Sequence, residues 1–226
     1  MHTRSPSRMP AMRNSIVALA GALLGAFCAA TPVQVSVLDK DGQPVVDAVV
    51  VVITASKAAP ARPLAREVTI SQEKMRFVPA VTLVPVGAKA RFVNNDPWEH
   101  HVRASAAGVA QFDAGPAGGF ELMIGAKPEG KPGKTADATF DKPGAVLLGC
   151  HLHNSMRGHV YVSDSPWAAL TGADGLATLD VPEGAASIKV WHADQLIDIA
   201  PQQVMLGDAP AKATLQLNVV PRRKRI

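Results

Sequence analysis

Gly149-Cys150-His151-Leu152-His153-Asn154-Ser155-Met156-Arg157-Gly158 is the stretch that decides how this sequence is interpreted. It places one thiol, one imidazole and one thioether at regular spacing, at Cys150, His153 and Met156, and His151 is a further histidine within it. The only other cysteine, Cys28, lies in the N-terminal leader described below. A lone thiol in an exported protein is buried and inert, paired between chains, or held as a thiolate by a metal. The neighbouring histidine and methionine favour the metal.

A second segment, Phe92-Val93-Asn94-Asn95-Asp96-Pro97-Trp98-Glu99-His100-His101-Val102, supplies another imidazole at His100. Two imidazoles, one thiolate and a long thioether contact form the trigonal site that copper accepts in both oxidation states. Structural zinc sites prefer four strong ligands and usually paired cysteines, and an iron–sulfur cluster needs more thiolates than this chain has. We therefore predict one copper ion, Cu(I) or Cu(II), with these metal ligands: His100, Cys150, His153 and Met156.

The body of the chain carries strand signals rather than helix signals. Val33 to Leu38 alternates at period two, Asp39 to Gly42 is a turn, and Val45 to Ile53 is a β-branched run, which together predict a hairpin. Further short strands are expected around 67–70, 81–84, 89–93, 102–104, 145–148, 158–162, 177–181, 187–191 and 214–219, with a glycine-rich loop over 108–133. The predicted fold class is all-β and sandwich-like.

The N-terminal residues 1–30 have the three parts of a secretory signal peptide. Arg4, Arg8 and Arg13 are positive, residues 16–27 are apolar, and small residues end the segment at Ala30. The apolar run is shorter than the roughly 20 residues that a membrane-spanning helix needs. We expect cleavage near Ala30 and a periplasmic protein without a membrane span.

The charge gives little support to nucleic-acid binding. The net charge of +4 over 226 residues includes three arginines of the leader and a basic tail at 221–226. The remaining body is therefore not basic, and we predict no nucleic-acid partner.

The ligand loop, from Cys150-x-x-His153-x-x-Met156 to Val160, resembles that of the cupredoxins, with the short spacing of amicyanin. The segment leading to His100 is similar to the plastocyanin segment that carries the first histidine. This resemblance covers about Arg66 to Val162 and implies a Greek-key sandwich over residues 64–162. Two positions depart from the family pattern, since His101 stands where asparagine is usual and residues 146–148 lack the common aromatic.

The flanking segments resemble two halves of a transthyretin-like, carboxypeptidase-regulatory-type β-sandwich. These halves are residues 31–55 and 163–220, so that the cupredoxin would be inserted between them. The arrangement is similar to exported proteins often described as methylamine utilisation or plastocyanin-like proteins. Residues 55–63 and 163–166 would then be the two connections.

The resemblance implies a one-electron carrier rather than an enzyme, with a redox protein of the cytochrome or quinone/amine dehydrogenase type as partner. Periplasmic copper delivery or storage, and an exported structural or adhesion module with a vestigial site, are the alternatives. In cupredoxins the loop histidine is the electron port, which implies His153 here. Alternation along a strand points His101 away from the ligands. Candidates for groups around the site or for the port are Asn95, His101, Trp98 and Leu152.

Overall fold

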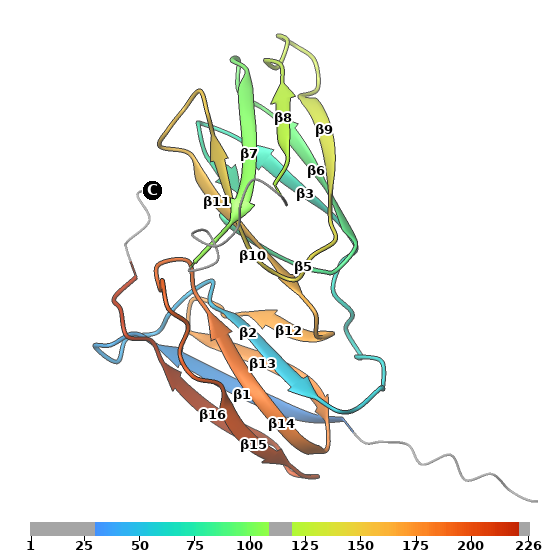
Figure 1. Ribbon diagram of the computed structural model, residues 1–226, viewed down its shortest axis with the longest axis vertical. Helices are drawn as coiled ribbons and strands as arrows, with labels where there is room; N and C mark the ends of the chain where they lie inside the picture. The colour runs from blue at the N-terminus through green and yellow to red at the C-terminus, as the bar shows by residue number, and fades with distance from the viewer. Residues whose placement is uncertain (1–29, 109–118, 222–226) are drawn as a thin grey trace, which may run out of the picture.

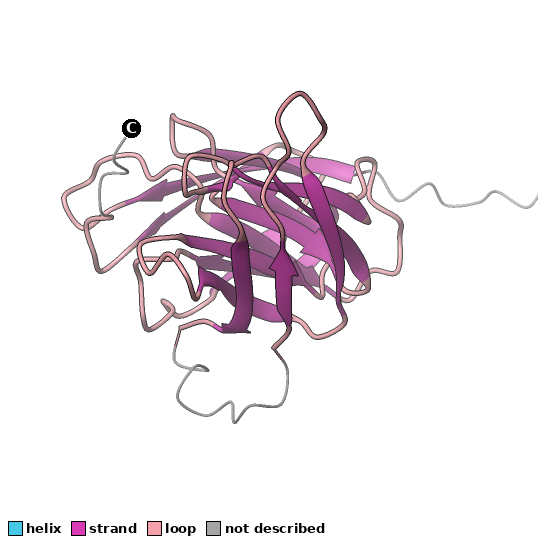
Figure 2. Ribbon diagram, turned by 90° about the horizontal axis from the view of Figure 1, so that it is seen from above, coloured by secondary structure: helices cyan, strands magenta, loops and turns pink. Residues whose placement is uncertain are grey.

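The structure is a computed structural model that describes residues 30–108 and 119–221, and these form strands and loops without a helix (Figure 2). The predicted all-β class is thus confirmed. All but Pro221 of the predicted tail and all but Ala30 of the predicted leader lie outside the described residues. Within the described residues, no helix is long and apolar enough to cross a membrane.

In the described part of the chain, sixteen strands form four sheets, which pair into two sandwiches stacked along the long axis (Figure 1). The strands are β1 (Ala30–Leu38), β2 (Val49–Thr54), β3 (Glu67–Gln72), β4 (Phe77–Val78), β5 (Val81–Pro85), β6 (Ala88–Asn94), β7 (His100–Ala106), β8 (Glu121–Ile124), β9 (Lys134–Phe140), β10 (Gly144–Cys150), β11 (Arg157–Ser163), β12 (Trp167–Leu170), β13 (Leu176–Pro182), β14 (Gly184–Trp191), β15 (Gln202–Leu206) and β16 (Ala211–Gln216).

One sandwich is built from both ends of the described chain. Its sheets have the orders β13-β1-β16 and β12-β2-β14-β15, so a strand from the N-terminal part lies inside each sheet. The predicted hairpin of β1 and β2 is wrong, because the chain makes only an isolated bridge between Leu38 and Pro44 before β2 enters the other sheet. The transthyretin-like character of this sandwich stays a prediction.

The other sandwich lies between these two parts in sequence. Its sheets have the orders β5-β11-β10-β7-β8 and β4-β3-β6-β9. Their inner faces form one core that includes Phe92, Leu148, Cys150 and Met156. Strands β8 and β9 were not expected from the sequence. β8 lies within the loop predicted over 108–133, which is wrong at this point, and β9 has few apolar residues to give an alternating pattern.

The valine run of β2 is buried on both faces. Val50 and Val52 belong to the core of their own sandwich, whereas Val49 and Val51 belong to a second cluster with Tyr161 of β11. A continuous β-branched run is typical of a strand covered on both sides. The two sandwiches therefore meet through an apolar interface at this strand.

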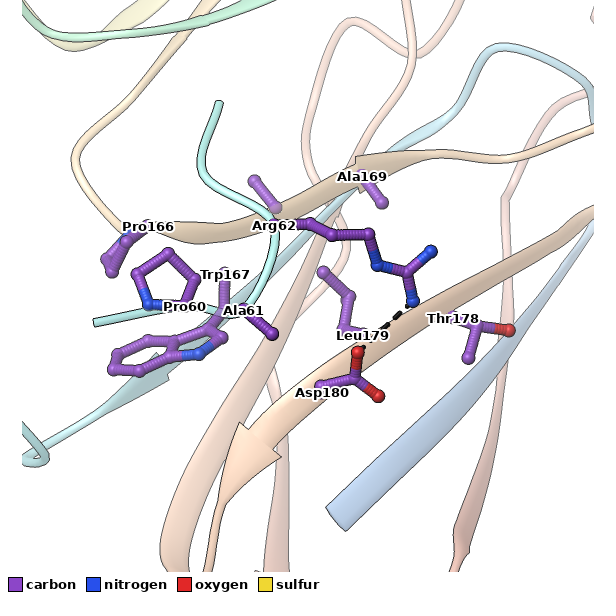
Figure 3. Close-up of a pocket in the computed structure, with 10 residues that line it drawn as sticks. Pro60, Ala61, Arg62, Pro166, Trp167, Ala169, Thr178, Leu179 and Asp180 are labelled. Carbon is purple, nitrogen blue, oxygen red and sulfur yellow. Dashed lines mark hydrogen bonds and ion pairs between the residues drawn. The ribbon is translucent and has the colours of Figure 1, made fainter. Parts of the chain in front are cut away.

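The segment that connects the sandwiches after β2 packs back over the first one. Arg62 forms an ion pair with Asp180 of β13, with 3.1 Å between its guanidinium nitrogen and the carboxylate oxygen. Figure 3 shows this pair at the rim of a small pocket lined by Pro60 and Trp167. Exposed ion pairs of this kind contribute little free energy, so this contact holds the connecting segment only weakly.

We predict that the C-terminal part of the first sandwich does not fold alone. A fragment of residues 164–226 lacks β1, which lies between β13 and β16, and β2, which lies between β12 and β14. Without β1 and β2, the remaining strands have unpaired edges and many of the core residues are absent. A sheet of only two strands is marginally stable in water. Circular dichroism with thermal unfolding of this fragment should show no cooperative transition. Adding a peptide of residues 31–55 should restore one, and cooperative unfolding of the fragment alone would contradict the prediction.

Candidate metal centre

Two adjacent antiparallel strands bring the first histidine and the cysteine together. Val102 of β7 pairs with Cys150 of β10. The start of β7 and the end of β10 therefore lie side by side at the same end of the sheet. His100 and Cys150 both point into the core, because residues two apart on a strand share a face. His100 is fully buried and Cys150 is 5% exposed.

His100, Cys150 and His153 form a cluster with the spacing of ligands to one ion. The Cys150 sulfur lies 3.6 Å from His100 Nδ1 and 3.5 Å from His153 Nδ1. Thiolate and imidazole ligands lie about 2.3 and about 2.0 Å from a metal, which places sulfur and nitrogen about 3.5–3.7 Å apart at near-trigonal angles. In the described part of the chain, this cluster is the one set of three or more histidine, cysteine or acidic side chains whose ligand atoms all lie within 4.8 Å of one another. The residues present therefore fit copper.

Met156 closes the loop between β10 and β11. Its backbone N–H donates to the carbonyl of His153 at 2.9 Å, which tightens the turn that carries both side chains. The side chain is 1% exposed and packs in the same core as Cys150. Its burial beside the cluster is compatible with a weak axial thioether, and this role stays a prediction.

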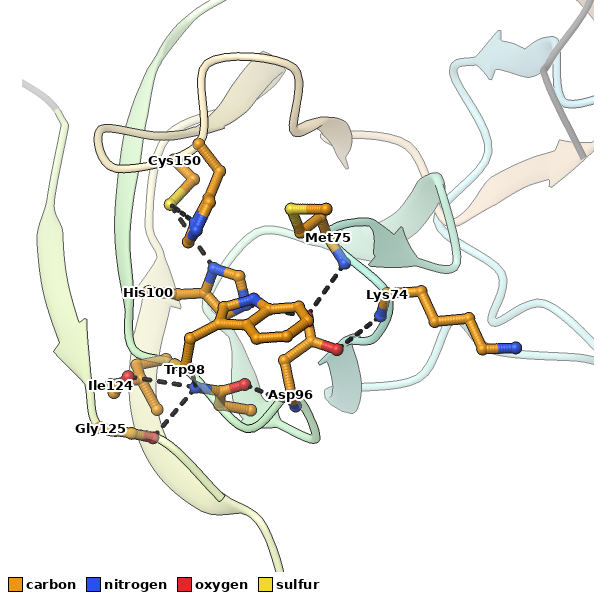
Figure 4. A network of polar contacts seen from close by, with 10 residues as sticks. Lys74, Met75, Asp96, Trp98, His100, Ile124, Gly125 and Cys150 are labelled. Carbon is orange, nitrogen blue, oxygen red and sulfur yellow. Dashed lines mark hydrogen bonds and ion pairs between the residues drawn. The ribbon is translucent and has the colours of Figure 1, made fainter. Parts of the chain in front are cut away.

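The second ring nitrogen of His100 is held by a buried carboxylate. Asp96 Oδ2 lies 2.9 Å from His100 Nε2, and the Asp96 side chain is 5% exposed (Figure 4). Such a partner fixes the ring orientation of a metal-binding histidine and leaves the other nitrogen free for the metal. Asp96 therefore aims His100 Nδ1 at Cys150.

Asp96 also holds the turn between β3 and β4. The N–H groups of Lys74 and Met75 donate to its carboxylate at 2.6 and 3.0 Å. Both residues have positive φ, 52° and 57°, a conformation that is unfavourable for residues other than glycine. Charge-assisted hydrogen bonds to Asp96 offset this backbone cost.

Burial and hydrogen bonding act in opposite directions on Asp96. Burial raises the pKa of this carboxyl, but the hydrogen bonds from Met75, His100 and Lys74 together outweigh it, so the net pKa is below the ordinary value. The group is therefore ionised at neutral pH. Its negative charge complements the ring N–H that His100 directs toward it.

The amide that organises the loop before His100 belongs to Asn94. Its side-chain nitrogen donates to the carbonyls of Trp98, Ile124 and Gly125 at 2.7, 3.2 and 3.0 Å, and its oxygen accepts from the N–H of Asp96 at 2.9 Å. Asn95, which the sequence suggested, donates its backbone N–H to Gln72 instead. The alternation of β6 could have identified Asn94, since it shares the buried face with Phe92.

The remaining candidates lie around the cluster at the surface. The ring of Trp98 is 6.4 Å from the ring of His153, between centroids, and Trp98 and Leu152 are 40% and 46% exposed. His101 lies on the outer face, with Nε2 3.0 Å from Glu121 Oε2. His151 follows Cys150, and its ring faces that of His101 at 5.6 Å between centroids. The structure therefore separates the inner cluster from two outer histidines.

Comparison with known families agrees with this geometry. Residues 64–163 match the family described as copper binding proteins, plastocyanin/azurin family. The search of curated proteins gives no match. The match covers the sandwich that contains the cluster.

Solved structures of copper proteins are similar to part of the chain. A reduced amicyanin variant is 21% identical, over 50% of this chain and 99% of its own, with a TM-score of 0.34. Amicyanin from Paracoccus versutus is 24% identical over 50% of this chain and 97% of its own, with a TM-score of 0.33. A pseudoazurin from Sinorhizobium is 22% identical over 44% of this chain and 75% of its own, with a TM-score of 0.32.

We predict that Asn94→Ala destabilises the protein and Asn95→Ala does not. The first change removes all the hydrogen bonds that a fully buried amide makes, and should lower the free energy of unfolding by about 2–4 kcal/mol. The second removes a half-buried side chain without a comparable network and should cost less than about 1 kcal/mol. Denaturant unfolding of the two metal-free variants measures the difference, and equal losses would contradict this assignment.

Proposed function

Residues 64–163 of this chain form a cupredoxin domain that binds copper, and from this premise we propose that the protein is an exported type 1 copper protein that carries single electrons. The observation that carries the proposal is the buried cluster of His100, Cys150 and His153, whose nitrogen and sulfur atoms already have the spacing of ligands to one ion. Its ligands would be these three residues, with Met156 as the weak axial contact.

Copper bound to such a set supplies a reversible one-electron couple. The protein residues would hold this ligand set in one arrangement in both oxidation states of the ion. Cys150 ends a central strand, His100 is fixed by Asp96, and the His153–Met156 turn is closed by a backbone hydrogen bond. A site that moves little on reduction needs little reorganisation, which favours a carrier over an enzyme or a delivery protein.

His153 supports a route for the electron to the surface. It is the ligand residue that is only partly buried, and two exposed apolar side chains, Trp98 and Leu152, belong to the loops around it. Exposed apolar patches of this kind mark contact sites. Transient redox interfaces are small, so a patch of a few side chains is sufficient.

The proposed partner is a redox protein of the cytochrome or quinone/amine dehydrogenase type, met in the periplasm after the leader at 1–30 is removed. The order of positive, apolar and small residues in that leader supports export. The flanking sandwich, proposed as a transthyretin-like domain, carries no cluster of potential metal ligands among its described residues. We assign it a structural role toward the copper domain.

The ligand roles predict distinct spectra for three variants. Cys150→Ala should abolish the intense thiolate-to-copper absorption, because no other sulfur is placed as an equatorial ligand. Met156→Gln should keep the absorption and shift the reduction potential, because an axial ligand mainly tunes the potential. Met123→Gln is the matched control, since Met123 is 59% exposed on β8 and should leave both unchanged. Visible spectra and voltammetry measure these effects, and an intense band that survives Cys150→Ala would rule out the proposal.

The port predicts slower electron self-exchange when charge is added beside His153. An oxidised and a reduced copy would meet through this patch, so Leu152→Glu places a carboxylate on each of the two facing surfaces. The repulsion between the carboxylates should lower the exchange rate at least about tenfold at low ionic strength. Leu196→Glu, at a similarly exposed position of the other sandwich, should have no effect. Nuclear magnetic resonance line broadening measures the rate while the visible spectrum checks the copper site. Equal rates in both variants would show that electrons leave elsewhere.

A further inference from the structure

Three potential metal ligands lie in a row on the outer face of the sheet that holds Cys150. Glu121 belongs to β8, His101 to β7, and His151 follows β10, so they come from three neighbouring parts of the sheet β10-β7-β8. The backbone N–H of His151 donates to the carbonyl of His101 at 2.9 Å, which places these two residues directly opposite each other. Their side chains point away from the core that contains His100 and Cys150.

The distances within this row are close to those of a metal site. His101 Nε2 lies 3.0 Å from Glu121 Oε2, and the rings of His101 and His151 are 5.6 Å apart between centroids. The rings of His100 and His153, which face one another in the buried cluster, are 4.9 Å apart. Two imidazoles with nitrogens about 2 Å from one ion have centroids about 5 Å apart. The ligand atoms of the three groups do not yet all lie within 4.8 Å of one another. A metal ion would therefore have to draw the exposed His151 side chain toward His101 and Glu121.

The chemistry of the three groups selects a class of ion. Imidazole nitrogens suit copper, zinc and nickel, and two histidines with one carboxylate leave positions open for water. Among divalent ions of the first transition row, Cu²⁺ binds such nitrogen-rich sites most tightly. One group opposes a cation here, because the Arg103 guanidinium lies 2.9 Å from Glu121 Oε1.

We propose that His101, His151 and Glu121 form a second, solvent-open site for a divalent transition-metal ion, with Cu²⁺ as the preferred ion. The site is independent of the buried cluster in its ligands and is accessible from solvent, since the side chains of His101 and Glu121 are 21% and 54% exposed. It is nevertheless joined to that cluster by two peptide bonds, His100–His101 and Cys150–His151. The alternative is a set of surface ion pairs, which would contribute little to stability and would bind no metal.

The test uses the full mature protein with one equivalent of copper already bound. A second equivalent of Cu²⁺ is added and followed by electron paramagnetic resonance, and Zn²⁺ is titrated separately by calorimetry. We expect a second Cu²⁺ signal that adds no thiolate absorption. His151→Ala and Glu121→Gln should weaken the affinity for the second ion at least about tenfold and leave the first copper spectrum unchanged. Glu129→Gln, a change of a carboxylate outside the row, should bind both equivalents like the parent.

Arg103→Ala separates a metal site from a network of ion pairs. If Glu121 is a ligand, loss of the competing guanidinium should leave the second affinity equal or higher. If Glu121 only orders the surface through its contacts with Arg103 and His101, this variant should lose the second ion as Glu121→Gln does, and the proposal fails. Binding that persists unchanged in His151→Ala would show an adventitious ion only, and absence of a second equivalent would equally overturn the site. All of these outcomes are distinguishable from failure of the buried centre, whose own spectrum is recorded throughout.

Discussion

The arrangement of the copper centre depends on one buried carboxylate. Asp96 accepts hydrogen bonds from Lys74 and Met75 in one loop and contacts His100 in another, so a single side chain sets the separation of both. A buried charge without such partners would cost several kcal/mol. Because three donors satisfy it, the carboxylate stays ionised and is fixed in place. The orientation of His100 therefore follows from the β3–β4 turn as much as from β7 itself.

The turn between β3 and β4 shows how this constraint acts on the backbone. Two successive residues with positive φ are typical of the tight hairpin turn that normally contains asparagine and glycine. Here the positions are Lys74 and Met75, neither of which prefers that conformation. The N–H groups of both residues are directed at Asp96, and the gain from those bonds explains why the sequence tolerates the conformation. Turn propensity alone would not have predicted a hairpin at these residues.

The sequence was sufficient for the parts of the structure that follow from ligand chemistry and from strong periodicity. Cys150 and His153 are close in sequence, and His100 is the histidine whose strand begins beside them, so the cluster could be predicted. The β8 and β9 strands could not, because their pairing with β7 and β6 is decided by tertiary contacts rather than by apolar alternation. The hairpin of β1 and β2 failed for a related reason. Both faces of β2 are buried, and burial on the outer face requires the second sandwich, which local pattern does not reveal.

The strand that follows Met156 explains why the two sandwiches are joined. On β11, Val160 and Val162 face the core that contains Cys150 and Met156. Tyr161 faces outward and packs against Trp191 of β14, with ring centroids 5.5 Å apart. Burial raises the pKa of Tyr161 to about 12, helped by the charges of Asp198 and Asp164, so the phenol remains neutral in this interface. The sheet that contains β11 thus presents an apolar outer face that would be exposed without its neighbour. Because β11 begins directly after Met156 and is covered on both faces, the flanking sandwich restrains the strand on which the ligand loop ends.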